Sequence, residues 1–262
     1  MKKNLFLALC LIALSPLCLK AETITAIDSR VTFVGRTAVE GTSVSFDWTA
    51  TYFRIAFSGN KLTMKASDLK VGAADEAAAA KLHNYYNVWI DSPTSAQPHR
   101  IVEVKEGDNI IELVDPNYLR RSRRSVHEVI VQKRTEGEQG RTTIHSFTTD
   151  GRFYQATPLC ERQLEFIGDS YTCGYGIDAP TKEEKFSPET ENASRSYAAI
   201  VSRYFGADYI AVAHSGMGMV RNYNSKFPKW NMPERYCQTF DMDSTQATRW
   251  NAADHAFKPA MS

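Results

Sequence analysis

The amino-acid sequence predicts two domains in series, a β-sandwich of the jelly-roll type followed by an α/β domain with parallel strands. Residues 31–134 alternate apolar and polar side chains in short runs separated by turns, which is typical of antiparallel sandwiches. After residue 159 the pattern changes to an apolar strand, a segment with helical spacing and a second apolar strand, which is typical of a parallel α/β unit. We therefore predict domains at residues 22–158 and 159–262.

The composition is globular and nearly neutral. The 262 residues are 43% hydrophobic and 23% charged, and 31 Lys and Arg residues face 30 Asp and Glu residues. This composition excludes collagen-like, coiled-coil and disordered chains. A net charge of +1 would not attract nucleic acid or an anionic membrane surface, so we expect a neutral partner and no nucleic acid.

Residues 1–21 resemble a secretory signal peptide. Two lysines precede an apolar run at residues 5–14, and Ala21 fits a cleavage site. No second apolar run is long enough to span a membrane, so we expect an exported, periplasmic or extracellular protein without membrane insertion. A lipoprotein would use Cys18, but a leucine precedes it where a small residue is required.

Cleavage after residue 21 would leave three cysteines, Cys160, Cys173 and Cys237. An odd number of cysteines cannot pair completely within one chain. The sequence has no short-spaced pairs of Cys or His ligands, so we predict no metal site and interpret the thiols as small buried side chains.

The strands of the first domain are predicted from their alternation. Residues 52–57 alternate strictly, and after a turn at residues 58–60 the alternation resumes at Leu62, which predicts a β-hairpin. Similar runs predict further strands at residues 85–90, 100–104, 109–114 and 128–132, with a return to the sandwich at residues 144–154.

Three stretches interrupt this alternation. Residues 71–82 are alanine-rich and predict a surface excursion with a helical turn. Residues 135–143 are polar and resemble a linker. A predicted loop carries four arginines that could bind phosphate or an acidic sugar, although a solvated loop is the favoured interpretation. These are Arg120, Arg121, Arg123 and Arg124.

In the second domain, a predicted strand at residues 164–167 runs directly into Gly168-Asp169-Ser170. A serine at the carboxyl end of a parallel strand is exposed at the edge where such sheets build their sites, so Ser170 is a candidate nucleophile. Thr172 stands where the five-residue nucleophile elbow requires glycine. A Gly-Asp-Ser triplet by itself also occurs in ordinary turns.

The next predicted strand supplies a second loop at the same edge. A helix predicted at residues 196–205, with Ser194 or Ser196 as N-cap, leads to a strand at residues 209–213. His214-Ser215-Gly216-Met217-Gly218 follows this strand. The parallel arrangement places Gly216 beside Ser170, where its N–H can approach a substrate oxygen.

The segment from Leu164 to Gly176 resembles the first motif block of the SGNH hydrolases, and most closely carbohydrate esterase family 2, the two-domain deacetylases of plant cell-wall polysaccharides. Arg221-Asn222-Tyr223 and Met232-Pro233 resemble later family segments. The resemblance implies a flavodoxin-like fold for the second domain. Segments that resemble the family's jelly-roll signatures are Phe46-Asp47-Trp48, Asn87-Val88-Trp89-Ile90-Asp91 and Lys133-Arg134-Thr135-Glu136.

The resemblance also implies roles for individual residues. Ser170 would attack an acetyl carbonyl and form an acetyl-serine intermediate. The backbone N–H groups of Ser170 and Gly216 would be two of three oxyanion donors, and Asp169 would order the loop. The implied substrate is an acetylated polysaccharide or oligosaccharide of xylan, mannan or glucan, with no metal or organic cofactor. Cys173 matches a family position and is interpreted as a packing residue.

Two family blocks do not occur in this sequence: a Gly-x-Asn-Asp block with an oxyanion asparagine, and an Asp-x-x-His block with the histidine that deprotonates the serine. We therefore expect an incomplete catalytic domain that is inactive or weakly active, and marginally stable because its sheet is small. Asp254-His255 has the wrong spacing. His214 is a possible surrogate base, although a strand-end histidine is more often structural.

Two other functions remain open. The first is a carbohydrate-binding β-sandwich protein with a vestigial esterase half, in which Trp48, Trp89 or Tyr85 would stack on sugar rings. Aromatic residues in a sandwich are more often part of the core. The second is a fragment that neither binds nor cleaves. Release of acetate from an acetyl ester would separate the esterase from both.

Overall fold

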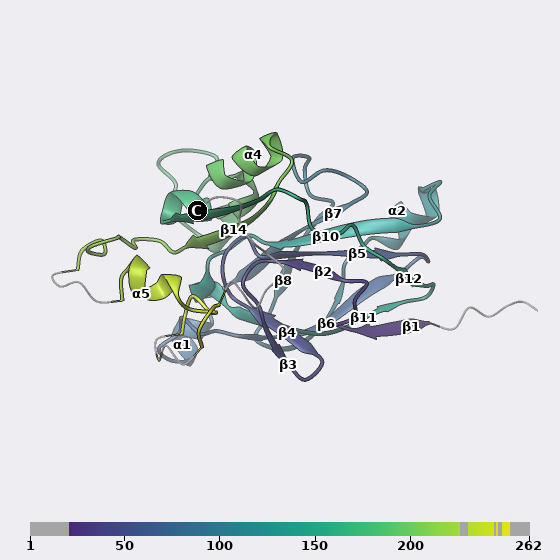
Figure 1. The fold of residues 1–262 in the computed structure, drawn as a ribbon, viewed down its shortest axis with the longest axis horizontal. Helices are drawn as coiled ribbons and strands as arrows, with labels where there is room; N and C mark the ends of the chain where they lie inside the picture. Colours follow the sequence, from purple (N-terminus) through teal and green to yellow (C-terminus); the bar gives the residue numbers. More distant parts are fainter. Residues whose placement is uncertain (1–20, 226–229, 244, 246–247, 252–262) are drawn as a thin grey trace, which may run out of the picture.

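Two antiparallel sheets make up the first part of the chain, and a parallel α/β unit lies on the outer face of one of them (Figure 1). The computed structural model describes residues 21–225, 230–243, 245 and 248–251. The first strand begins at Glu22, and most of the expected signal peptide lies outside the described residues. No described helix is long and apolar enough to cross a membrane.

The first sheet has the strand order β3-β4-β11-β6-β9, with β1 also paired to β11. The second sheet has the order β12-β5-β10-β7-β8, with β2 also paired to β5. The strands of the first sheet are β1 (Glu22–Thr25), β3 (Ala38–Glu40), β4 (Ser43–Phe46), β6 (Leu62–Leu69), β9 (Gly107–Glu112) and β11 (Arg141–Thr149). Those of the second are β2 (Thr32–Val34), β5 (Tyr52–Phe57), β7 (Asn84–Ile90), β8 (Arg100–Val104), β10 (His127–Lys133) and β12 (Phe153–Tyr154).

The facing sides of the two sheets share one apolar core. Phe53 and Val131 of the second sheet and Met64 and Phe147 of the first are each at most 1% exposed. Period-two alternation produces this core, because successive side chains of a strand point to opposite faces. The strands expected at residues 85–90, 100–104, 109–114, 128–132 and 144–154 are confirmed within a few residues. We refer to this part as the two-sheet domain.

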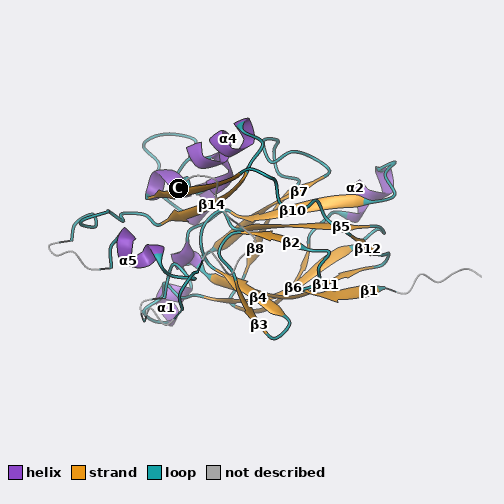
Figure 2. Cartoon of the chain, in the orientation of Figure 1, coloured by secondary structure: helices purple, strands orange, loops and turns teal. Residues whose placement is uncertain are grey.

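The hairpin predicted at residues 52–64 is wrong. Strand β5 pairs with β10 in the second sheet, whereas β6 pairs with β11 in the first. The turn at residues 58–60 therefore carries the chain from one sheet to the other (Figure 2). Alternation does not distinguish these cases, because strands of both sheets bury every second side chain in the same core.

Two of the segments that interrupt the alternation are the alanine-rich stretch at residues 71–82 and the arginine cluster. The excursion at residues 71–82 contains α1 (Glu76–Ala79), capped by Asp75, as predicted. Two of the four arginines lie in α2 (Pro116–Arg121) and the other two follow it. All four are exposed, so the cluster is solvated as predicted, although part of it is helical and not a loop.

The linker expected at residues 135–143 is wrong. Most of this segment is buried; it forms the short helix η1 (Gly137–Gln139) and then enters β11. Its polar groups are satisfied inside the protein: Lys133 Nζ donates to the carbonyl of Glu136 at 3.3 Å, and Glu136 N donates to Glu191 at 3.2 Å. A polar composition indicates a solvated linker only when these hydrogen bonds are made to water.

The α/β unit has the predicted elements. Strand β13 (Gln163–Gly168) is parallel to β14 (Asp208–Ala213), with Gly168 paired to Ala213. Ser196 is the N-cap residue of the helix α4, but its side chain makes no capping hydrogen bond. The helical elements of this unit are α3 (Ser170–Cys173), η2 (Pro188–Thr190), η3 (Ala193–Arg195), α4 (Tyr197–Tyr204) and α5 (Met232–Tyr236).

The two-stranded parallel sheet is covered by its neighbours. Strand β14 and helix α4 lie above the outer face of the second sheet in Figure 1. Ala50 and Tyr52 of the two-sheet domain share an apolar cluster with Ala198, Tyr209 and Ala211. Every residue of β5 is buried: Phe53, Ile55 and Phe57 belong to the core between the two sheets, and Tyr52 and Arg54 contact the α/β unit.

Candidate active site at the ends of the parallel strands

Ser170 begins the helix that follows β13. Asp169 is its N-cap, and the Asp169 carboxylate accepts a hydrogen bond from Tyr171 N at 3.1 Å. This contact satisfies a helix N–H that would otherwise lack a partner and holds the turn that exposes Ser170. No hydrogen bond to the Ser170 hydroxyl is present among the described residues.

Gly168 permits this sharp turn. A Cβ at Gly168 would lie 2.0 Å from Oγ1 of Thr172, which is hydrogen-bonded to Tyr197 Oη at 2.8 Å. The Thr172 side chain thus fills the space that Gly168 leaves open. Thr172 is also the residue that stands where the five-residue nucleophile elbow requires glycine. The sequence Gly168-Asp169-Ser170 is therefore part of a tightly packed strand end and not an incidental turn.

The loop after β14 meets the Ser170 turn. Gly216 has a φ of 76°, a conformation that favours glycine, and its carbonyl accepts a hydrogen bond from Tyr223 N at 2.7 Å. Ser170 and Gly216 line the same pocket, which has a volume of about 520 Å³. The other lining residues are Asp169, Tyr175, Ser215, Met217, Arg221 and Tyr223.

Aromatic side chains border this pocket. Tyr223 is 81% exposed, and Tyr175 stacks on Phe186 with ring centroids 3.7 Å apart. Exposed aromatic rings beside an open pocket offer flat apolar surfaces to a partly apolar ligand such as a sugar ring. By contrast, Trp48 and Trp89, which the sequence offered as sugar-stacking residues, are at most 1% exposed and belong to the protein interior.

His214 has the contacts of a structural cation. Its Nδ1 donates to Asp241 Oδ2 at 2.7 Å and lies 3.8 Å from Glu136 Oε2. Burial lowers the pKa of His214, but Asp241 and then Glu136 outweigh burial and raise the pKa to about 9. An imidazolium has no lone pair to accept the serine proton, so this environment argues against His214 as a surrogate base. Asp254 and His255 lie outside the described residues.

Asp241 and Asp47 connect this ion pair to the two-sheet domain. Arg235 is paired with the Asp241 carboxylate, and His214 and Arg235 hold the pKa of Asp241 below its usual range despite burial. Asp241 N donates to Asp47 Oδ1 at 2.7 Å. Burial, together with the charge of Asp241, raises the pKa of Asp47 to about 6.

Glu136 is the site residue that sequence reasoning missed. Its carboxylate is fully buried and accepts a hydrogen bond from Ser215 N at 2.6 Å. It comes from the segment interpreted as a linker, although the family-like run Lys133-Arg134-Thr135-Glu136 was a signal that could have singled it out.

Glu136 also belongs to a group of three potential metal ligands in the described part of the chain, with Cys173 and Glu191. Burial raises the pKa of all three groups, and those of Cys173 and Glu191 lie well above their usual values. Metal binding would require the Cys173 thiol and both carboxyls to release their protons in this interior. Protonated Cys173 and Glu191 side chains would be poor metal ligands, so the group fits a buried polar cluster better than a metal site.

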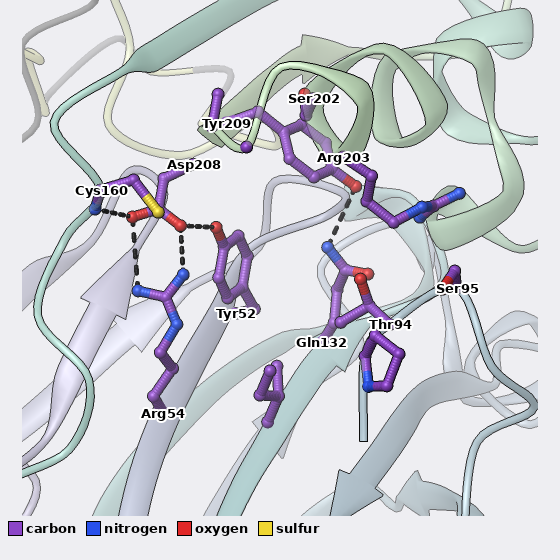
Figure 3. A pocket seen from close by; sticks show the side chains of 14 residues that line it. Tyr52, Arg54, Thr94, Ser95, Gln132, Cys160, Ser202, Arg203, Asp208 and Tyr209 are labelled. Atoms are coloured by element: carbon purple, nitrogen blue, oxygen red, sulfur yellow. Dashed lines mark hydrogen bonds and ion pairs between the residues drawn. The ribbon is translucent and has the colours of Figure 1, made fainter. Parts of the chain in front are cut away.

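A second pocket, of about 410 Å³, lies at the opposite ends of the parallel strands. Figure 3 shows Arg54 and Tyr52 of β5 directed at Asp208, the first residue of β14. Tyr52 Oη donates to Asp208 at 2.6 Å, and Gln132 donates to Tyr209 Oη at 3.1 Å. These polar groups bond to one another across the domain junction, so we interpret this pocket as a packing gap.

The comparisons with known proteins agree with this architecture. Residues 33–158 match the family model "Carbohydrate esterase 2 N-terminal". An acetylxylan esterase / glucomannan deacetylase of Cellvibrio japonicus is 32% identical over 217 residues, which cover 79% of this chain and 53% of that protein. The chain thus spans about half the length of this curated relative.

Solved structures show the same fold. A family two carbohydrate esterase from Cellvibrio japonicus superposes with a TM-score of 0.76 at 24% identity, over 90% of this chain and 64% of that one. A family two carbohydrate esterase from Clostridium thermocellum, solved in complex with cellohexaose, gives a TM-score of 0.72 at 26% identity, over 87% and 63% of the two chains.

Taken with the strand-end serine, these matches show that the chain shares the SGNH-like fold of the family two carbohydrate esterases. The family is carbohydrate esterase family 2, whose N-terminal domain occupies residues 33–158. The jelly-roll and flavodoxin-like details of the two domains remain predictions.

Proposed function

We propose that this chain belongs to a serine esterase that removes O-acetyl groups from plant cell-wall polysaccharides of the xylan, mannan or glucan type. The observation that carries the proposal is the shared pocket of Ser170 and Gly216 at the ends of two parallel strands. The relative named acetylxylan esterase / glucomannan deacetylase and the neighbour solved with cellohexaose support the substrate class.

The mechanism uses the serine twice. The Ser170 hydroxyl attacks the acetyl carbonyl, and the N–H groups of Ser170 and Gly216 stabilise the negative charge that develops on the carbonyl oxygen. Collapse of this intermediate breaks the ester bond, releases the sugar hydroxyl and leaves an acetyl group on Ser170. Water then attacks the acetyl-serine, releases acetate and restores the hydroxyl.

The proton acceptor for Ser170 is not one of the groups that line the pocket. None of the described residues that line the pocket is a histidine, and the raised pKa of the nearby His214, about 9, favours its protonated form at neutral pH. We therefore place the general base outside the described residues. A serine without a base reacts slowly, since removal of a catalytic-triad member costs several powers of ten in rate.

Release of acetate from acetylated xylan and from 4-nitrophenyl acetate tests the proposal. We expect slow turnover by the 262-residue chain. Turnover should be faster when the C-terminal half of a family 2 esterase is added as a separate polypeptide that lacks its own catalytic serine. Ser170→Ala should abolish both activities, whereas Ser125→Ala, in an exposed loop, should leave them unchanged. Turnover that survives Ser170→Ala would refute the assignment.

The same assay separates the alternatives. A carbohydrate-binding protein would retain polysaccharide and release no acetate, and an inert fragment would do neither. Export is part of the proposal, because polymeric substrates of this kind lie outside the cell and residues 1–21 resemble a signal peptide. The intact mass of secreted protein should then correspond to a chain beginning at Glu22; retention of Met1 to Ala21 would contradict export.

A further inference from the structure

We propose that Glu136, a residue of the two-sheet domain, is a positioning residue of the esterase site: its carboxylate holds the loop that presents the Gly216 N–H to the substrate. This inference rests on the proposed function for its catalytic consequence. Its structural part, the anchoring of the loop across the domain junction, stands on the contacts alone.

The first observation is the direct contact. Glu136 Oε2 accepts the hydrogen bond of Ser215 N at 2.6 Å, and Ser215 is adjacent in sequence to Gly216. Both carboxylate and loop lie where water has little access, since Glu136 is fully buried. A charge-assisted hydrogen bond in such surroundings is stronger than its solvent-exposed equivalent. It restricts the peptide plane directly before the proposed oxyanion donor.

The second observation is that the same carboxylate oxygen contacts the serine helix. Cys173 Sγ lies 3.9 Å from Glu136 Oε2, and Cys173 is the last residue of the helix that begins at Ser170. One oxygen of the two-sheet domain therefore lies between the two elements whose separation determines the geometry of nucleophile and oxyanion donor. Catalytic geometry is sensitive to displacements of this kind.

The third observation concerns the cost of this arrangement. Oε1 of Glu136 and Oε1 of Glu191 are buried and have no hydrogen-bond partner within the described structure. Burying acceptors in this way costs free energy, and such exceptions call for an explanation. Burial raises the pKa of Glu136, and the His214 ring, with Nδ1 3.8 Å from Glu136 Oε2, opposes this effect and favours the carboxylate.

The remaining loop contacts do not replace Glu136. Met217 N bonds to the His214 carbonyl at 3.1 Å, and Tyr223 N bonds to the Gly216 carbonyl at 2.7 Å. Both of these bonds lie within the loop region itself and would move with it. Among the described residues, the bond from Ser215 N to Glu136 is the one that ties the backbone of the loop to the two-sheet domain.

Amide hydrogen exchange of the whole 262-residue chain tests the anchoring without any ligand. Glu136→Ala should accelerate exchange of the Ser215 amide by about tenfold or more, as expected for loss of a hydrogen bond to a charged group. Glu136→Gln retains an acceptor oxygen and should have a smaller effect. Glu138→Gln, two residues along in η1 and bonded to Gln139, is the matched control and should change nothing at Ser215.

Kinetics test the catalytic consequence in the complemented enzyme described above. Glu136→Gln should lower kcat for 4-nitrophenyl acetate about tenfold with little change in KM, because oxyanion contacts act mainly in the transition state. A merely structural role would lower the melting temperature without this split between kcat and KM. If Glu136→Ala does not fold, the Gln variant still decides the question.

The outcomes are distinguishable. If neither the 262-residue chain nor the complemented enzyme shows Ser170-dependent turnover, the proposed function fails, and the exchange rate of Ser215 still decides whether Glu136 anchors the loop. Unchanged exchange at Ser215 in both Glu136 variants would overturn the inference. So would Ser170-dependent turnover with an unaltered kcat in Glu136→Gln.

Discussion

Replacing Asp208 by asparagine should destabilise the junction between the two domains. Asp208 is 1% exposed and is paired with the Arg54 guanidinium; it also accepts hydrogen bonds from Tyr52 Oη at 2.6 Å and from Cys160 N at 2.7 Å. The substitution keeps an acceptor oxygen but removes the charge. Arg54, which is 8% exposed, would then lack its counter-ion in a buried position.

The magnitude follows from this geometry. Breaking a buried ion pair by removing one partner costs about 3–5 kcal/mol, and the remaining amide oxygen places Asp208→Asn near the lower end. A loss of about 3 kcal/mol is a large part of the stability of a typical domain. Arg54→Met combined with Asp208→Asn should recover part of the loss, because no unpaired charge then remains.

Urea unfolding followed by circular dichroism measures this loss. Hydrogen bonds and Arg54 hold the pKa of Asp208 below its usual range although burial opposes them. Its contribution is therefore present above the unfolded pKa of about 3.9 and is lost as the pH falls through the lower folded pKa. Glu183→Gln, with a side chain 70% exposed, is the control. A difference below about 0.5 kcal/mol at pH 7, or no recovery in the double variant, would refute the reasoning.

Two further predictions concern the same junction. The raised pKa of His214, about 9, means that its ion pair stabilises the fold fully below the unfolded pKa of about 6.5 and less as the pH rises through 9. The stability difference between the unmodified chain and His214→Gln should therefore shrink from pH 6 to pH 10 in urea titrations, and a constant difference would contradict this assignment. A chain ending at residue 158 should melt several degrees below the 262-residue chain, because it exposes Val34, Ala50 and Tyr52; equal melting temperatures by calorimetry would show that the junction adds no stability.

The local patterns of the sequence were sufficient to predict the individual strands and part of the candidate active site. Alternation over residues 52–57 predicts a strand because side chains of a strand point alternately to its two faces. The apolar runs ending at Gly168 and Ala213 predict two parallel strands, and such strands bring their carboxyl ends to one edge. The sequence alone therefore predicts that Ser170 and Gly216 lie at one place, and both line the same pocket.

The partners of these elements depended on contacts far apart in the sequence. Alternation does not reveal that β5 and β6 belong to different sheets, because both sheets bury alternate residues in one core. The polar composition of residues 135–143 predicts solvent exposure, but the α/β unit covers this segment and supplies its hydrogen bonds.

The sequence by itself therefore determined the alternation of the strands, the serine at a strand end and the resemblance to family 2 esterases, because each depends on residues that are close together in the chain. Only the tertiary structure decided that Glu136 contacts the loop of Gly216 and that Asp241 raises the pKa of His214. Both depend on groups that are distant in the chain: the Glu136 carboxylate accepts from Ser215 N, and His214 contacts the Asp241 carboxylate. Burial strengthens these interactions, and burial is a property of the assembled domains rather than of any local segment.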